Sequence, residues 1–160
     1  MNNPDGFREA VPTEYAGVKF RAKSEAIFAR ALDLEKLLWE YEPPDFFDPG
    51  IWKPDFFICW RSKGHKVAKC LLEFKPCETT EAYRESLHIK INDSLGQLGG
   101  KFFFLLVEAS PFDVSGKASV YSIANNPHHP IEAPIFKSVV SMFSEARKFR
   151  FDLKNGGGRV

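Results

Sequence analysis

The 160-residue chain is predicted to adopt an α/β fold, because segments with helix and strand patterns follow one another along it. Residues 24–38 carry apolar side chains at helical spacing. Two short runs on either side of Gly64 are rich in aromatic, β-branched and apolar residues, which indicates a β-hairpin. A strongly apolar run at 101–107 is typical of an interior strand that is buried on both faces. We therefore expect a sheet with helices packed against it.

The first half of the chain predicts one helix and three strands. The apolar stripe of the helix at 24–38 consists of Ile27, Phe28, Ala31, Leu32 and Leu34. A short strand at 39–42 follows and is stopped by Pro43-Pro44. The hairpin strands are predicted at 56–60 and 67–72, with Gly64 near the middle of the polar segment that joins them.

The second half predicts two more helices and two more strands. One helix opens at Thr79-Thr80-Glu81, with a threonine as its N-cap, and runs to about Asp93. A glycine-containing turn at 95–101 leads into the apolar strand, and another strand is expected at 120–124. The last helix is predicted at 135–149, with these residues facing inward: Val139, Val140, Met142, Phe143 and Ala146. We expect one domain over 1–154 and a flexible, glycine-rich tail at 155–160.

Composition bounds the class of protein. The sequence shows no apolar run long enough to span a bilayer and no signal-peptide pattern, which predicts a soluble cytoplasmic protein without a membrane partner. Cys59, Cys70 and Cys77 show no CxxC spacing, and the first two are expected on opposite faces of the hairpin, so all three are predicted to be reduced. The net charge of +1 gives no protein-wide attraction to phosphate.

Two carboxylates and an ammonium group are expected to meet at the base of the hairpin. Glu73 and Lys75 are two residues apart, so they project from the same face of a strand. If the hairpin is symmetric about Gly64, Asp55 falls opposite Glu73, with Cβ atoms about 4.5–5.5 Å apart. Like charges at that separation destabilise a sheet unless a cation neutralises them. The pattern therefore predicts a divalent metal, Mg²⁺ or Mn²⁺, which takes hard oxygen ligands.

Pro54-Asp55 followed by Glu73-Phe74-Lys75 resembles the signature of the PD-(D/E)xK nuclease superfamily. The resemblance covers roughly residues 15–110 and includes the segment at 17–26 and the strand end at 39–43. In this order the motifs are similar to small phage and mobile-element nucleases, to transposase endonuclease subunits and to phage junction-resolving endonucleases. The resemblance implies a restriction-endonuclease-like αβββαβ core, with a mixed central sheet flanked by helices.

The resemblance also implies roles for individual residues. The catalytic set would be Glu25, Asp55, Glu73 and Lys75. The metal ligands would be Asp55, Glu73, the main-chain carbonyl of Phe74 and Glu25, while Lys75 would hold the attacking water. Each residue also has a simpler interpretation. Glu73 and Lys75 can form an exposed ion pair, Asp55 can be a turn residue after Pro54, and Glu25 can be an acidic residue favoured by the helix dipole.

The predicted function is hydrolysis of DNA phosphodiester bonds by a metal-dependent endonuclease. Two alternatives stay open: a non-catalytic nucleic-acid-binding or assembly module that keeps the nuclease fold, and a nuclease subunit that is active only with a transposase-like partner. A homodimer or a protein partner is also possible, and Phe46 and Phe47 in a Pro/Asp/Gly-rich loop are candidates for such a contact. Four basic residues are candidates for contacts with DNA, with solvated surface as the alternative: Lys19, Arg21, Lys23 and Lys53.

Overall fold

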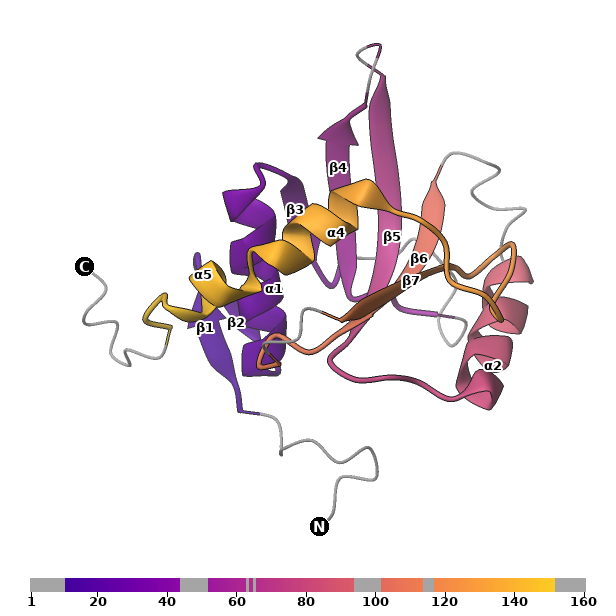
Figure 1. Ribbon diagram of the computed structural model, residues 1–160, viewed down its shortest axis with the longest axis horizontal. Coiled ribbons are helices and arrows are strands. Elements are labelled where there is room, and N and C mark those ends of the chain that lie inside the picture. Colours follow the sequence, from indigo (N-terminus) through magenta and orange to yellow (C-terminus); the bar gives the residue numbers. More distant parts are fainter. Residues whose placement is uncertain are drawn as a thin grey trace.

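The computed structural model describes residues 11–43, 52–62, 64, 66–93, 102–113 and 117–151, and it has a five-stranded mixed sheet with helices on both faces (Figure 1). The predicted loop with Phe46 and Phe47, the turn at 95–101 and the tail at 155–160 lie outside the described residues. The elements in chain order are β1 (Thr13–Tyr15), β2 (Val18–Phe20), α1 (Lys23–Leu34), β3 (Leu38–Tyr41), β4 (Phe56–Arg61), β5 (Val67–Lys75), α2 (Glu81–Asn92), β6 (Phe103–Ala109), β7 (Ala118–Ser122), α4 (Pro134–Ser141) and α5 (Phe143–Arg147).

The sheet has the strand order β3-β4-β5-β6-β7, in which only β5 and β6 run parallel. Helix α2 lies between these two strands in sequence and supplies the crossover that a parallel pair requires. Phe56 pairs with Leu72 and Arg61 pairs with Val67, which confirms the predicted register of the hairpin about Gly64.

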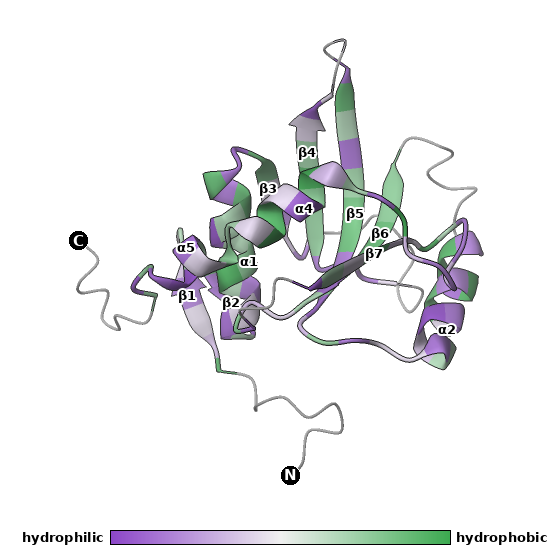
Figure 2. Ribbon diagram, in the orientation of Figure 1, coloured by the Kyte–Doolittle hydropathy of each residue, from purple (hydrophilic) through white to green (hydrophobic). Residues whose placement is uncertain are grey.

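The two faces of the sheet are covered differently. Helices α1, α4 and α5 and the β1–β2 hairpin build the larger core on one face, where the Phe28 ring contacts those of Phe56, Phe74 and Phe143. Helix α2 covers the other face with a smaller cluster that includes Leu87. Figure 2 shows the sheet strands mostly apolar and α2 mostly polar, as expected for a helix with one face in solvent.

The N-terminal part differs from the prediction in two ways. Helix α1 ends at Leu34 rather than at residue 38, because the chain reverses at Lys36 (φ 62°) and Leu38 pairs with Cys59 in the sheet. The β1–β2 hairpin was not predicted. Its turn residues, Ala16 and Gly17, both have positive φ, as a two-residue type I′ turn requires.

The second half follows the predicted order with shifted bounds. Thr80 is the N-cap of α2, and its hydroxyl accepts a hydrogen bond of 3.1 Å from the Tyr83 amide. Strand β6 begins two residues later than predicted, and β7 begins two residues earlier. The predicted helix at 135–149 is wrong as a single helix. It breaks at Met142, where the Met142 amide bonds to the Val139 carbonyl and the Ser141 hydroxyl bonds to the Ser138 carbonyl.

The three cysteines are free, as predicted. Cys59 pairs with Lys69 and Cys70 pairs with Ile58, so the two thiols lie on opposite faces of the hairpin. No helix among the described residues is long and apolar enough to cross a membrane.

Candidate functional site

The candidate site lies at the end of the β4–β5 hairpin that is opposite Gly64. Asp55 directly precedes β4, and Glu73 and Lys75 lie in the C-terminal part of β5. Leu71 belongs to the cluster beneath α2. Because side chains alternate along a strand, Glu73 and Lys75 project from the same face as Leu71. The structure therefore places the predicted pair on the α2 face of the sheet.

Asp55 is fixed by hydrogen bonds to both neighbouring strands. Its amide donates to the Leu72 carbonyl (2.9 Å), and its carbonyl accepts from the Glu42 amide at the end of β3 (2.7 Å). Its carboxylate oxygen Oδ2 accepts a bond of 2.9 Å from the Phe74 amide. Asp55 thus bonds to the residues on both sides of Glu73, which holds its carboxylate beside that residue.

The electrostatics of Asp55 favour a bound cation. Burial, and after it the negative charge of Glu73, raises the pKa of Asp55 to about 8, against the lowering effects of the Phe74 amide and Lys75. Without a cation, this environment therefore favours the neutral form of the Asp55 carboxyl. A divalent cation would favour the ionised form of Asp55, because it offsets the repulsion from Glu73.

Glu73 is held by two donors that the sequence did not indicate. The Trp52 indole donates to Oε1 at 2.9 Å, and the Tyr83 hydroxyl donates to Oε2. Burial, and after it the charge of Glu73, raises the pKa of the Tyr83 phenol, so Tyr83 stays protonated and remains a donor. The spacing of Tyr83, Leu87 and Ile91 on one side of α2 is a signal that could have placed Tyr83 over the sheet. Trp52 lies outside the helices and strands and carries no comparable signal.

Lys75 lies where its spacing predicted, on the same face as Glu73. Its Nζ atom is 3.4 Å from Glu73 Oε2 and 5.4 Å from the centre of the Tyr83 ring. The Lys75 side chain is 36% exposed, against 11% for Glu73. Such a half-exposed ion pair contributes little stability by itself. What matters for chemistry is that the ammonium group lies beside the carboxylates and remains open to solvent.

Glu25 makes no described hydrogen bond or ion pair with the other three residues. It is in the first turn of α1, and its Oε1 accepts bonds from the Tyr41 hydroxyl (2.7 Å) and the Ala22 amide (3.3 Å). Burial raises the pKa of Glu25. Its charge contributes to the raised pKa of Asp55, but less than burial and Glu73 do. Among the described residues, no group of three or more His, Cys, Asp or Glu side chains is placed to hold a metal ion.

The donor set nevertheless fits a hard divalent cation at Asp55 and Glu73. Both residues offer carboxylate oxygens, and Mg²⁺ is usually held by one or two carboxylates together with water. Of the two carboxylate oxygens of Asp55, only Oδ2 accepts a hydrogen bond from a described residue. The other oxygen, Oδ1, is available to a metal. The main-chain carbonyl of Phe74 stays a predicted ligand, while the Phe74 amide donates to Asp55.

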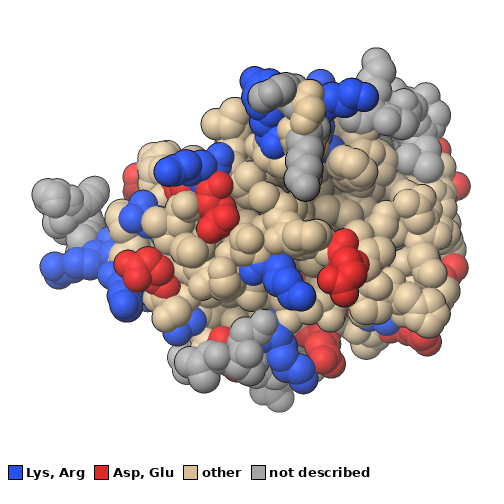
Figure 3. Space-filling view, turned by 45° about the horizontal axis from the view of Figure 1, so that its top comes forward, with Lys and Arg blue, Asp and Glu red and all other residues tan. Residues whose placement is uncertain are grey.

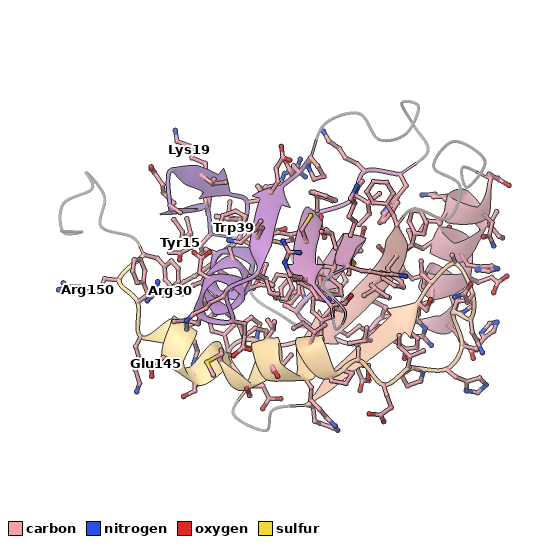
Figure 4. All side chains as sticks on the ribbon, turned by 90° about the horizontal axis from the view of Figure 1, so that it is seen from above. Tyr15, Lys19, Arg30, Trp39, Glu145 and Arg150 are labelled. Atoms are coloured by element: carbon pink, nitrogen blue, oxygen red, sulfur yellow. The ribbon has the colours of Figure 1, made fainter. Side chains whose placement is uncertain are left out.

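The four basic residues predicted to contact DNA come from β2, from the start of α1 and from the segment before β4. Lys19 is opposite Glu14 in the β1–β2 hairpin, and Figure 4 shows it pointing away from the body of the molecule. Arg21 forms an ion pair of 2.8 Å with Glu42. Lys23 opens α1, and the exposed Lys53 precedes Pro54 and Asp55. Acidic neighbours thus offset the charges of Lys19 and Arg21.

Comparison with known proteins gives no match to any family model, curated protein or solved structure. We therefore infer a function from the residues of the site and from their geometry.

Proposed function

We propose that this chain is a metal-dependent endonuclease that hydrolyses DNA phosphodiester bonds. The observation that carries the proposal is the grouping of Asp55, Glu73 and Lys75 at one end of the β4–β5 hairpin. Two carboxylates whose charges repel each other, with an ammonium group beside them, are suited to hold a divalent cation and an attacking water.

The order of the elements supports the proposed fold. Without the β1–β2 hairpin, the chain reads α1-β3-β4-β5-α2-β6, followed by β7 and two helices. This order agrees with the αβββαβ core expected for a restriction-endonuclease-like fold. We therefore propose that the chain resembles the PD-(D/E)xK superfamily in the order of its elements as well as in its motif.

Each residue has a chemical task in this proposal. Asp55 and Glu73 hold Mg²⁺ or Mn²⁺, which when bound lowers the pKa of a water and offsets the charge that develops on the phosphate oxygens. Trp52 and Tyr83 orient the Glu73 carboxylate. Lys75 holds the attacking water or stabilises negative charge on phosphate, since an ammonium group has three donors and no acceptor. Glu25 acts through water or at a second metal.

The test is a cleavage assay of the purified chain with Mg²⁺ or Mn²⁺ on single-stranded, duplex and branched DNA and on RNA. We expect metal-dependent cleavage of at least one form of DNA. Lys75→Ala should abolish cleavage and keep metal binding in calorimetric titrations, because an ammonium group is not a metal ligand. Asp55→Ala should lose both activities.

Lys137→Ala, at an exposed position of α4, is the control for these variants and should cleave like the wild type. The proposal fails if the folded wild type cleaves no DNA. The assigned roles fail if Lys75→Ala and Asp55→Ala lose metal binding equally.

A second candidate is a nucleic-acid-binding or assembly module without turnover. It is favoured by the position of Glu25, which bonds to Tyr41 and makes no described contact with Asp55 or Glu73. A chain that is active only with a transposase-like partner would show the same geometry when alone. Binding of DNA without cleavage, with metal bound at Asp55, would support this second candidate.

A further inference from the structure

The outer part of the β4–β5 hairpin is a two-stranded ribbon. Strand β3 pairs with β4 only as far as Cys59, and β6 pairs with β5 only from Cys70 onward. Beyond these positions Trp60 pairs with Ala68 and Arg61 pairs with Val67, and no third described strand joins them. Figure 1 shows this ribbon standing out above the rest of the sheet. Trp60 packs against Phe103 and against Phe136 of α4, so the opposite face of the ribbon, which carries Arg61, is the one open to a large partner.

The ribbon is strongly basic in a chain that is nearly neutral. Residues 61–69 (RSKGHKVAK) hold four Lys or Arg and neither Asp nor Glu, whereas the whole chain has 22 Lys and Arg against 21 Asp and Glu. Arg61, Lys66 and Lys69 are exposed. Figure 3, in which the top of Figure 1 comes forward, shows blue side chains gathered at this end. The chain thus has a local positive potential at the ribbon although its net charge is close to zero.

Two basic residues of the ribbon, Lys69 and Arg61, share a face with the candidate site, while Lys66 directly precedes β5. Lys69 is four residues from Glu73 on β5, so its side chain projects to the same side, about 13 Å away along the strand. Arg61 is six residues from Asp55 on β4, about 20 Å along the same face. Glu40 of β3 is on this face too, but it is opposite Phe57, below the ribbon. One face therefore carries the carboxylates at its base and cations farther out.

This arrangement fits B-form DNA better than double-stranded RNA. The major groove of B-DNA is about 12 Å wide and admits a two-stranded β-ribbon. The major groove of A-form RNA is deep and narrow, and side chains do not reach into it.

We propose that the ribbon of residues 60–62 and 66–69 binds in the major groove of duplex DNA, with Arg61, Lys66 and Lys69 against the backbone phosphates. In this position the phosphodiester that is cleaved lies at Asp55 and Glu73. The inference rests on the proposed function, which supplies DNA as the substrate, but the predicted binding requires neither metal nor turnover.

The test measures binding of the full chain to labelled duplex DNA by fluorescence anisotropy, with a chelator present, over a series of salt concentrations. The ribbon variant is Arg61→Gln/Lys66→Gln/Lys69→Gln. The control variant, Lys148→Gln/Arg150→Gln, loses exposed positive charges after α5, at the end of the molecule where Figure 4 labels Arg150. The variant Arg61→Lys/Lys66→Arg/Lys69→Arg keeps the charge of the ribbon and shows that the site tolerates substitution.

We expect the ribbon variant to bind duplex DNA at least about tenfold more weakly. The logarithm of its binding constant should also fall less steeply with the logarithm of salt concentration, by about 2.7 in the slope, since each phosphate contact contributes about 0.9. The control and charge-preserving variants should change the affinity by less than about twofold, because neither removes a contact with phosphate. Equal weakening by the ribbon and control variants, tighter binding of duplex RNA than of DNA, or no binding by the wild type would overturn the inference.

The two proposals fail separately. If the wild type cleaves no DNA but the ribbon variant alone loses binding, the nuclease proposal is wrong and the ribbon proposal stands. If the wild type cleaves DNA and the ribbon variant binds DNA like the wild type, the ribbon proposal is wrong and the nuclease proposal stands.

Discussion

The two faces of the central sheet perform different tasks. On the α1 face, the sheet and the helices α1, α4 and α5 meet in the larger of the two apolar cores, which includes Phe28 and Leu32. On the α2 face, a smaller apolar cluster is bordered by ionisable side chains. The larger apolar core thus lies on one face, and the buried charged residues Glu73, Arg84 and Glu108 lie on the other.

The polar border of the α2 face extends beyond the candidate site. The Arg84 guanidinium is 3.7 Å from Glu108 and donates to the carbonyls of Thr79 and Pro127, each at 2.8 Å. Glu108 in turn accepts the Thr79 amide at 2.9 Å. Glu108 is opposite Lys75 in the parallel pair of β5 and β6. This network fixes the start of α2 against the sheet and thereby places Tyr83 over Glu73.

The largest expected effect is on unfolding, and it compares the same substitution on the two faces. Leu32 in α1 and Leu87 in α2 are both buried, at 0% and 4% exposure. Leu32→Ala should cost near the upper end of the range of about 2–5 kcal/mol, because the large core around it relaxes little. Leu87→Ala should cost near the lower end, because α2 can move toward the sheet. Urea unfolding measures both, and equal losses would contradict the division between the faces.

A smaller effect of opposite sign is expected for Asp55→Asn in the metal-free protein. The folded-state pKa of Asp55 is raised, so the folded protein holds a proton that the unfolded chain releases. The contribution of Asp55 to stability is therefore greatest below the unfolded pKa, and it is lost as the pH rises through about 8. Asparagine does not ionise, so the Asp55→Asn variant does not lose stability in this way as the pH rises. Its amide oxygen can still accept the hydrogen bond from the Phe74 amide.

We expect Asp55→Asn to be more stable than the wild type by about 0.5–2 kcal/mol near pH 8.5, with a smaller difference near pH 5. Millimolar Mg²⁺ should stabilise the wild type, since a ligand that binds only the folded state adds to its stability, and should have little effect on the variant. Thermal and urea unfolding with chelator and with Mg²⁺ measure this. If Asp55→Asn is less stable without metal and the wild type ignores Mg²⁺, Asp55 is a structural turn residue.

The smallest effect compares two tyrosine–glutamate hydrogen bonds. Tyr83 donates to Glu73 on the α2 face, and Tyr41 donates to Glu25 at the start of α1. Tyr83→Phe should cost about 1 kcal/mol, because a buried carboxylate loses one of its donors. Tyr41→Phe should cost less, because Glu25 is more exposed than Glu73 and water can replace the donor. Urea unfolding of both variants without metal measures the difference, and a larger loss for Tyr41→Phe would reverse the ranking.

The sequence predicted the parts of this molecule that depend on local signals. Gly64 and the polar segment around it determined the hairpin register, and that register placed Asp55 beside Glu73. Thr80 identified the start of α2. The end of α1 could not be predicted from periodicity, because pairing of Leu38 with Cys59 in the sheet competes with the last helical turn. The β1–β2 hairpin was missed because each of its strands is only three residues long.

The sequence predicted the charged residues of the candidate site but not the neutral residues that contact them. Asp55, Glu73 and Lys75 follow from strand alternation, which a sequence displays directly. Trp52 and Tyr83 reach Glu73 from outside the sheet, so their contacts depend on how those segments pack. The bond between Glu25 and Tyr41 likewise depends on the angle at which α1 meets β3.

The described hydrogen bonds of the Asp55 and Glu73 side chains all lie within one continuous stretch, residues 52–83. The longest of them in sequence joins Trp52 to Glu73, 21 residues apart. A single short segment of the gene therefore encodes the carboxylate pair, its lysine and its donors together. From outside this segment, the Glu42 amide bonds to the Asp55 carbonyl and the charge of Glu25 raises the pKa of Asp55. The side-chain hydrogen bonds of the carboxylate pair are thus local in sequence, whereas the charges that act on it come from more distant parts of the chain.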